Sequence, residues 1–309
     1  MTDQLSESLV VAVLTYRRPG DLADVLPLLV AQAREVSPTA HVLVVDNDPD
    51  ASAADLVSGF AAQGVRYVCE PVPGIAAARN RALAEAGTDL LVFIDDDERP
   101  EPGWLGLLVG TWLVDRPAAV VGPVVSRYEV DPEPWVTDGR FFDRRRLPTG
   151  TVVDVAATNN LLLDLRVLRA LDLRFDVRFG LSGGSDTLFT RQLVRAGERI
   201  VWCDEAVVLD VVPAARVTRA WVLQRAYRSG NGWSRTSLEM ATSPVARVAT
   251  RLECSARGVV RLAGGGARWV AGTVLRSQGQ RARGTRTVMR GAGLVSGAWG
   301  SVYSEYRRT

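Results

Sequence analysis

The sequence predicts an α/β fold with a mostly parallel sheet, flanked by helices and followed by a helical extension at the C-terminal end. Three observations lead to this prediction. Short runs rich in Val, Ile and Leu alternate with segments whose apolar residues recur every three or four positions. These runs are apolar at consecutive positions, which is typical of strands buried on both faces. Beyond residue 218 the spacing is mostly helical.

Four strands are predicted in the first hundred residues, with a helix between each strand and the next. The strands are expected at 9–14, 41–45, 65–68 and 90–94, and the helices at 21–33, 53–62 and 74–86. Strands that alternate with helices in this way pair in parallel. The carboxyl ends of parallel strands meet at one edge of the sheet, where ligands bind in open α/β folds.

The pattern after residue 100 is less regular. In order, we expect a helix from 100–104 onward, a strand at 119–125, a loop at 126–150, a strand at 152–163, a helix at 187–196, extended runs at 200–202 and 206–212, and helices beyond 218. Glycine lowers helix propensity. The three glycines at 264–266 and the many that follow therefore predict that long uninterrupted helices do not form there.

Composition restricts the class of protein. The 309 residues are 47% hydrophobic and 23% charged, which fits a globular chain and excludes a disordered or collagen-like one. No apolar run reaches the ~18 residues of a membrane span, and the polar, acidic start carries no secretory signal. The three cysteines lack the spacing of a zinc site, and the single histidine, His41, excludes mechanisms that need two.

The net charge of +2 conceals a basic C-terminal segment. Residues 240–309 hold twelve arginines and two acidic residues, whereas residues 1–239 hold 25 basic and 33 acidic ones. A basic segment attracts an acidic surface such as anionic lipid or nucleic acid. Val248, Leu252 and Val259 follow helical spacing, so the segment is predicted to be amphipathic. It either docks on an anionic membrane surface or packs on the rest of the chain.

Asp95, Asp96 and Asp97 directly follow the apolar run 90–94. Three adjacent carboxylates repel one another unless they are solvated or bound to a cation. Carboxylate oxygens suit Mg²⁺ or Mn²⁺, and either ion can bridge a diphosphate. The sequence therefore indicates a divalent metal at this edge of the sheet, with a solvated acidic turn as the alternative interpretation.

Three further segments end at the same edge. Thr15, Tyr16 and Arg17 follow the first strand and include a hydroxyl and an aromatic ring. Asp46 follows the second strand, where it either accepts hydrogen bonds from a nucleobase or ribose or forms a turn with its own backbone. Arg79 lies in a helix that opens with small residues, so it either reaches a phosphate or base or is a surface residue on a packing face.

These motifs carry a resemblance to a known family. LVVAVLTYRRP, VVDND, GIAAARNRAL and LLVFIDDDERP occur in the order and spacing of family 2 glycosyltransferases, and FGLSGGSDT at 179–187 is similar to the family's Gly-Gly-Glu-Asp segment. The resemblance covers about residues 8–235. It implies a GT-A fold, a nucleotide-sugar donor and a divalent metal held at a DXD-type cluster.

The resemblance also implies a division of the chain. Residues 1–239 would form the glycosyltransferase domain, with a nucleotide-binding half at about 8–100 and an acceptor half at about 101–239. Residues 240–309 lie outside the resemblance and form the basic, amphipathic, mostly helical extension.

The resemblance implies site residues position by position. Asp97 would ligate the metal, with Asp95 and Asp210 as further oxygen contacts, and Asp95 would also touch the ribose or donor sugar. Arg225 and Arg228 are three apart and share a helix face, which would clamp a diphosphate or anionic lipid unless it is simply a solvated basic face. The full set expected around the nucleotide is Thr15, Tyr16, Arg17, Asp46, Arg79, Asp95, Asp96, Arg225 and Arg228.

Asp186 matches the position of the family's catalytic base. The resemblance implies that it deprotonates the acceptor hydroxyl while the anomeric carbon inverts, a contribution of ~10²–10⁴-fold to the rate. Ser185 stands where the family usually has Glu, which puts acceptor binding in question more than base chemistry. Asp186 also suits a helix N-terminus, and the two roles are compatible.

We therefore expect an inverting transferase that uses a nucleotide sugar and Mn²⁺ or Mg²⁺. Its acceptor would be a glycan, a lipid-linked compound or a small molecule. Its expected location is the cytoplasm, with peripheral attachment to the inner face of the cell membrane as one option. A nucleotidyltransferase-like enzyme is one alternative, but the chain has no Gly-rich, Lys-bearing phosphate loop. A non-catalytic module that binds a nucleotide sugar or nucleic acid is another; only the basic segment supports it, and no nucleic-acid partner is expected.

Overall fold

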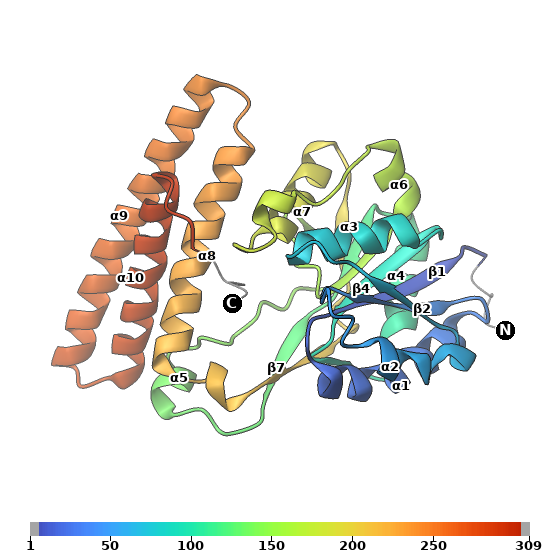
Figure 1. Ribbon diagram of the computed structural model, residues 1–309. Helices are drawn as coiled ribbons and strands as arrows, with labels where there is room; N and C mark the ends of the chain where they lie inside the picture. The colour runs from blue at the N-terminus through green and yellow to red at the C-terminus, as the bar shows by residue number, and fades with distance from the viewer. Residues whose placement is uncertain (1–5, 304–309) are drawn as a thin grey trace. The chain divides into compact units, whose positions relative to one another are not determined.

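The computed structural model describes residues 6–303, which fall into two compact units (Figure 1). The first, referred to as the sheet unit, takes in the chain up to Val125 together with Arg144–Leu181 and Ser185–Asp210. The second, the helical unit, takes in Ser126–Asp143, Ser182–Gly184 and the chain from Val211 onward. The chain therefore passes between the units several times, whereas the sequence predicts a single division at residue 239.

An eight-stranded sheet forms the centre of the sheet unit. Its strands are β1 (Leu9–Thr15), β2 (His41–Asp46), β3 (Val65–Cys69), β4 (Leu90–Asp95), β6 (Ala119–Val121), β8 (Val152–Val153), β9 (Asn160–Asp164) and β10 (Ile200–Trp202). Their order is β3-β2-β1-β4-β9-β6-β10-β8. Strands β3, β2, β1 and β4 pair in parallel, as do β6 and β10, whereas β9 runs antiparallel to both its neighbours. The predicted mostly parallel sheet is confirmed.

Helices cover both faces of this sheet. They are α1 (Pro19–Val36), α2 (Ala54–Ser58), η1 (Ala61–Gln63), α3 (Ile75–Glu85), α4 (Trp104–Asp115), α6 (Leu165–Ala170), η2 (Val177–Phe179) and α7 (Ser185–Arg195). Val11 and Val13 of β1 belong to the apolar core that α1 and α4 cover, and Val10 and Ala12 belong to the core that α3 and α7 cover. Burial on both faces is the reason that β1 is apolar at every position but its last.

A second, three-stranded sheet has the order β5-β11-β7. Its strands are β5 (Glu98–Pro100), β11 (Val208–Val212) and β7 (Val124–Tyr128). Two residues separate the end of β4 from the start of β5, and β5 pairs antiparallel with β11 so that Glu98 lies opposite Asp210. The tight turn between β4 and β5 therefore brings the acidic cluster beside a second acidic strand.

The helical unit contains α5 (Pro134–Asp138), η3 (Ala214–Arg216), α8 (Arg219–Glu239), α9 (Pro244–Val274) and α10 (Gln278–Ala298). α10 packs against both α8 and α9 (Figure 1). α9 runs for 31 residues without interruption, so the prediction that its glycines prevent long helices is wrong. No helix within residues 6–303 has the length and apolar character needed to cross a membrane.

Three glycines of α9, Gly258, Gly265 and Gly272, lie where α10 approaches most closely. A Cβ atom on Gly265 would lie 2.8 Å from the carbonyl oxygen of Gly284, and one on Gly291 would lie 2.8 Å from that of Gly258. Close packing of the two helices thus offsets the free-energy cost of placing glycine in a helix, because only a hydrogen atom fits between the two backbones at these positions.

Other differences from the predicted elements have local causes. The predicted strand 119–125 is two strands, β6 and β7, because Gly122 and Pro123 stand between them. The predicted strand 152–163 is likewise divided into β8 and β9, and the predicted loop 126–150 contains the end of β7 and the short helix α5. These segments are too short for hydrophobic periodicity to separate strand from turn.

Candidate active site

The acidic cluster lies at the carboxyl end of β4 and contacts the loop after β1. The Thr15 hydroxyl donates a 2.8 Å hydrogen bond to Asp96, which is buried. The Arg18 guanidinium bridges Asp96 at 3.2 Å and Asp97 at 2.7 Å. Burial raises the pKa of Asp96 to about 6, although the charge of Arg18 opposes the shift. Arg18 thus pairs with the second and third carboxylates of the cluster and was not singled out from the sequence.

Asp95 lies at the last position of β4. Burial, reinforced by the charge of Asp97, raises the pKa of Asp95 to about 7. The charges of Arg79 and Asp186 also act on the Asp95 carboxyl, so these four side chains lie within electrostatic reach of one another. The sequence prediction that the strand ends gather acidic groups at one site is consistent with this arrangement.

The donor set suits a divalent cation that shares its coordination with a ligand. Within residues 6–303, no three side chains of Asp, Glu, His or Cys group together in a way that would hold a metal by themselves. Mg²⁺ is commonly bound by one or two carboxylates together with substrate phosphates and water. Asp95 and Asp97 supply two such oxygens, and their mutual repulsion would be relieved by a cation.

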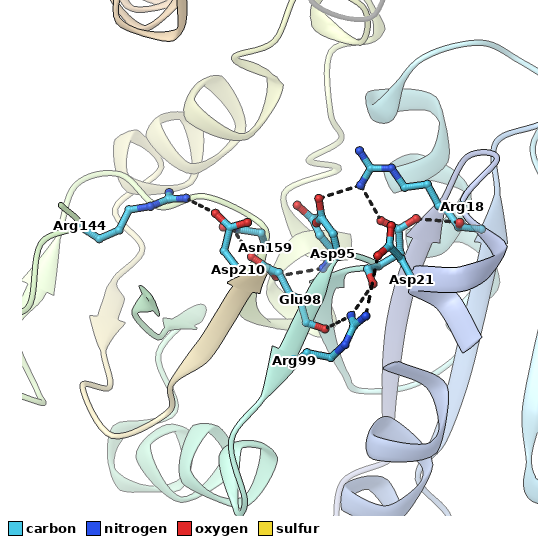
Figure 2. A network of polar contacts seen from close by, with 11 residues as sticks. Arg18, Asp21, Asp95, Glu98, Arg99, Arg144, Asn159 and Asp210 are labelled. Carbon is cyan, nitrogen blue, oxygen red and sulfur yellow. Dashed lines mark hydrogen bonds and ion pairs between the residues drawn. The ribbon is translucent and has the colours of Figure 1, made fainter. Parts of the chain in front are cut away.

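Glu98 is a buried carboxyl that the sequence analysis missed. Its Oε2 accepts a hydrogen bond from the backbone N–H of Asp95 at 3.2 Å, and its Oε1 accepts one from the Asn159 amide at 2.6 Å (Figure 2). Burial, and then the charge of Asp95, raises the pKa of Glu98 well above its usual range. Glu98 therefore fixes the turn that presents Asp95. The available signal was the fourth consecutive acidic residue in the run 95–98.

Asp210 joins the same acidic neighbourhood from β11. Its charge contributes to the raised pKa of Glu98, which lies opposite it in the strand pair. The Arg144 guanidinium donates a 3.0 Å hydrogen bond to its Oδ2 (Figure 2). Asp210 is thus close to the cluster, and its ion pair with Arg144 occupies one of its oxygens.

Asp46 has a different environment from the one we expected. It is fully buried, and its carboxylate accepts hydrogen bonds from the backbone N–H groups of Asp48 and Ala53 and from the Tyr67 hydroxyl, at 2.8–3.0 Å. These contacts favour the turn-forming alternative over direct nucleotide contact. Hydrogen bonding to Asp46, after burial, also raises the pKa of Tyr67.

Arg17 also contacts the loop after β2. It pairs with Asp48 at 2.9 Å and Asp50 at 2.7 Å, and its guanidinium lies 5.4 Å from the ring centre of Tyr16. About half of its side chain is exposed. Tyr16 and Arg17 therefore border the site beside Thr15, and Arg17 already has carboxylate partners.

Asn47 holds the loop between β3 and α3 at the same edge and was also missed. Its side-chain amide donates to the carbonyls of Glu70 and Val72 at 2.7 and 2.8 Å, and its oxygen accepts from the N–H of Gly74 at 3.0 Å. Asn47 thereby sets the start of α3, the helix that carries Arg79. Only its place beside Asp46 in the motif VVDND marked it in the sequence.

Arg79 links α3 to the start of α7. It is buried, donates a 2.8 Å hydrogen bond to the Ser185 hydroxyl, and lies over the ring of Phe175 at 5.5 Å. Asp186 follows Ser185 in the first turn of α7 and accepts a 2.7 Å hydrogen bond from the N–H of Thr187. The start of α7 thus presents Asp186 toward the side of the site where Arg79 and Asp95 lie. The predicted association of Arg79, Asp95 and Asp186 fits this geometry.

Arg225 and Arg228 belong to α8 in the helical unit. The Arg225 guanidinium lies 5.5 Å from the ring centre of Phe142 and 5.4 Å from that of Trp221, both in the same unit. These contacts give Arg225 a packing role inside its own unit. The part of Arg225 and Arg228 in binding a nucleotide stays a prediction.

Similarity to known proteins agrees with the fold. A model of the family described as Glycosyl transferase family 2 matches residues 10–168, slightly more than half of the chain. The chain is 35% identical over 234 residues to the succinoglycan biosynthesis protein ExoM of Rhizobium meliloti (strain 1021), and the match covers 75% of each chain.

Two solved structures share the architecture. The mannosyltransferase PcManGT of Pyrobaculum calidifontis, in complex with GDP-Man and Mn²⁺, superposes with a TM-score of 0.62 at 18% identity, over 96% of this chain and 88% of that one. The TarS 1–349 fragment of S. aureus, in complex with UDP, superposes with a TM-score of 0.52 at 14% identity, over 91% and 90%. At these identities the likeness shows the fold alone, which is the GT-A fold. From the family match and the identity to ExoM together, the chain belongs to glycosyltransferase family 2 and is a transferase enzyme.

Proposed function

We propose that this glycosyltransferase moves a sugar from a nucleoside-diphosphate donor to an acceptor hydroxyl, with inversion at the anomeric carbon. The observation that supports this most is that Asp97, Arg79 and Asp186 lie within electrostatic reach of the Asp95 carboxyl at the end of one strand. A site that gathers carboxylates and a buried arginine suits a ligand made of a metal ion and a diphosphate.

Asp97 and Asp95 are the residues proposed to hold Mn²⁺ or Mg²⁺, with Asp210 as a third oxygen contact. When bound, the ion would neutralise the negative charge that develops on the leaving diphosphate. Arg79 adds a fixed positive charge from α3, where it is held by Ser185 and Phe175. Because these groups are buried or half-buried, their electrostatic effect on the diphosphate is larger than it would be in water.

The nucleotide is proposed to lie along the ends of β1, β2 and β4. Thr15 and Asp96 form one wall through their mutual hydrogen bond, and Tyr16 and Arg17 form the rim. Asp46 supports this region through the backbone of its own turn. Arg225 and Arg228 of the helical unit are proposed to contact the diphosphate.

Asp186 is proposed as the general base. Its carboxylate accepts the proton of the acceptor hydroxyl while the acceptor oxygen bonds to the anomeric carbon. The bond between that carbon and the diphosphate oxygen breaks on the opposite face, and its electron pair leaves with the diphosphate. Removal of a general base commonly lowers the rate by ~10²–10⁴-fold.

The acceptor is proposed to be a growing polysaccharide or a lipid-linked glycan. ExoM, 35% identical to this chain, is named as a protein of succinoglycan biosynthesis, and a 25% identical relative from Pasteurella multocida is named a hyaluronan synthase. Solved neighbours hold GDP-Man in one case and UDP-GlcNAc in another. We therefore propose a GDP- or UDP-sugar donor.

The experiment compares the full chain with Asp186→Asn on a panel of UDP- and GDP-sugars with Mn²⁺ and oligosaccharide acceptors. We expect transfer to fall by ~10²–10⁴-fold while UDP or GDP binding, measured by calorimetry, stays within about twofold. Asp172→Asn serves as the control, because Asp172 is an exposed acid of the same unit. Full activity in Asp186→Asn would contradict the base assignment. Absence of nucleotide binding in the wild-type chain would contradict the donor site.

A further inference from the structure

Arg17 has an uncommon backbone conformation in the loop that follows β1. Its φ angle is +54°, in the left-handed region that residues other than glycine, asparagine and aspartate rarely adopt. An arginine in this region is less stable than one in the right-handed region, so it persists only where surrounding contacts hold it. The contacts of the Arg17 side chain show what holds it.

An ion pair between two loops holds Arg17 in this conformation. Its Nε donates to Oδ2 of Asp48 at 2.9 Å and its Nη2 to Oδ1 at 3.2 Å, which is the bidentate geometry of an arginine on a carboxylate. Asp48 is 1% exposed, so its charge depends on this partner. Nη2 also pairs with Asp50 at 2.7 Å. The loop after β1 is therefore tied to the loop after β2.

The same loop is tied in the opposite direction as well, because β1 lies between β2 and β4 in the sheet. On the β4 side, the Thr15 hydroxyl donates to Asp96 and the Arg18 guanidinium pairs with the same carboxylate. Tyr16 lies between these two sets of contacts in the chain, and its ring centre lies 5.4 Å from the Arg17 guanidinium. The backbone is thus fixed on both sides of the Tyr16 ring.

The strand order indicates which part of a nucleotide would lie near Tyr16. This step rests on the proposed function, in which the metal and diphosphate lie at the end of β4. β1 and then β2 follow β4 across the sheet, so the ribose and base would lie about 5–10 Å further on, over the loops after β1 and β2. Tyr16 is the only aromatic residue in these loops, at 16–18 and 47–53, and an aromatic ring suits stacking by any base.

We propose that Arg17 is a positioning residue for the base of the donor nucleotide. Its left-handed backbone, fixed by the ion pair with Asp48, presents the Tyr16 ring on which the base stacks. Arg17 acts through Tyr16 and does not contact the diphosphate, because its guanidinium is already paired with two carboxylates.

Two probes separate positioning of the base from contact with the diphosphate. Calorimetry of the full chain in Mn²⁺ measures the affinity for UDP or GDP, whichever the wild type binds more tightly, and for inorganic pyrophosphate, which has no base. We expect Arg17→Gly to weaken nucleotide binding by at least ~10-fold, because glycine adopts a positive φ readily but supplies no ion pair. Pyrophosphate binding should stay within about twofold of the wild type, since the Tyr16 ring does not act on it.

A double-mutant cycle tests whether Arg17 acts through its ion pair. Asp48→Asn should weaken nucleotide binding to a similar extent. The double variant Arg17→Gly, Asp48→Asn should weaken it no further, because either single change already breaks the same pair. The double variant also leaves no unpaired buried carboxylate, so we expect it to fold even where Arg17→Gly alone is too unstable to measure.

Arg116 provides a matched control at the other end of β1. Its φ angle is +46°, and its side chain is 52% exposed, like that of Arg17. Its guanidinium pairs with buried Glu7 at 2.8 Å and lies 5.0 Å from the ring centre of Trp112. Glu7 precedes β1, whose seven residues extend for about 20 Å. We expect Arg116→Gly to lower the unfolding temperature as Arg17→Gly does, but to bind nucleotide like the wild type.

Several results would overturn the proposal. Unchanged nucleotide binding in Arg17→Gly would remove its basis, and equal weakening of nucleotide and pyrophosphate binding would place Arg17 on the diphosphate. Additive losses in the cycle would show that Arg17 acts without Asp48. Weaker nucleotide binding in Arg116→Gly would show a general effect of lost stability. A wild type that binds neither UDP nor GDP would instead contradict the donor site itself, and the role of Arg17 with it.

Discussion

At the scale of single residues, Asp95 is an acid whose ionised form is disfavoured in the folded chain. Burial and the neighbouring charge of Asp97 raise its pKa to about 7, against an ordinary value of 3.8. Between these two values the folded state binds more protons than the unfolded state, so this group lowers stability as the pH rises. The destabilisation is absent below about pH 4 and complete above about pH 7.

Asp95→Asn is therefore expected to stabilise the metal-free protein at neutral and alkaline pH. The expected gain in the free energy of unfolding is on the order of 4 kcal/mol at pH 8, about 1 kcal/mol at pH 4.5 and close to zero at pH 3.5. Urea unfolding of both proteins in EDTA across this range measures it. Added Mn²⁺ should stabilise only the wild type. A gain that does not change with pH would contradict the assignment of the shift to Asp95.

Asn47 is a second residue whose contribution follows from its contacts. Its side-chain N–H groups donate to two carbonyls and its oxygen accepts from one N–H, all in the loop between β3 and α3 beside the proposed nucleotide site. Asn47→Ala is expected to cost about 1–3 kcal/mol of stability, because buried polar groups lose their partners. Thermal unfolding measures the loss. Nucleotide binding should weaken as well, since Gly74 at the start of α3 is no longer held; unchanged unfolding and binding would show that water replaces the amide.

At the scale of elements, the α9–α10 contact depends on residues without side chains. Gly265→Ala places a methyl group 2.8 Å from the Gly284 carbonyl oxygen, so we expect it to destabilise the protein by about 1–3 kcal/mol. Gly264→Ala is the matched control, because a Cβ there meets nothing within 4 Å. Alanine is the better helix former, so the control should stabilise by about 0.5–1 kcal/mol. Opposite signs in thermal unfolding support the packing; equal signs contradict it.

The elements differ in how well the sequence predicts them. β1, β2 and β4 follow from apolar runs, because burial on both faces leaves a strong local signal. The α9–α10 packing leaves a misleading local signal, since glycine disfavours a helix unless a partner helix packs closely against it. Similarly, Asp46 and Asp95 look alike as acids at strand ends, and only the three donors around Asp46 separate a turn from an open site.

At the scale of the whole molecule, the division into units is not visible in the order of the chain. The helical unit draws on Ser126–Asp143, which the sequence predicts as a loop, and on α8, which the family resemblance assigns to the catalytic domain. Charge changes sign near residue 240, but packing does not follow charge. A boundary set by contacts between segments that are distant in the sequence can be located only once the fold is known.

A chain that ends at residue 239 tests this division. It would remove α9 and α10, including Ala282, which is buried with Trp135, Phe141 and Phe142 in one apolar cluster. It would also remove the backbone carbonyl of Leu294 in α10, which accepts a hydrogen bond from the buried hydroxyl of Ser234 in α8. Exposed aromatic surface of this kind promotes association. We expect the shortened chain to be mainly insoluble or to unfold at a lower temperature than the full chain. If it remained monomeric with an unchanged unfolding temperature, α5 and α8 would belong with the sheet unit instead, as the sequence predicts.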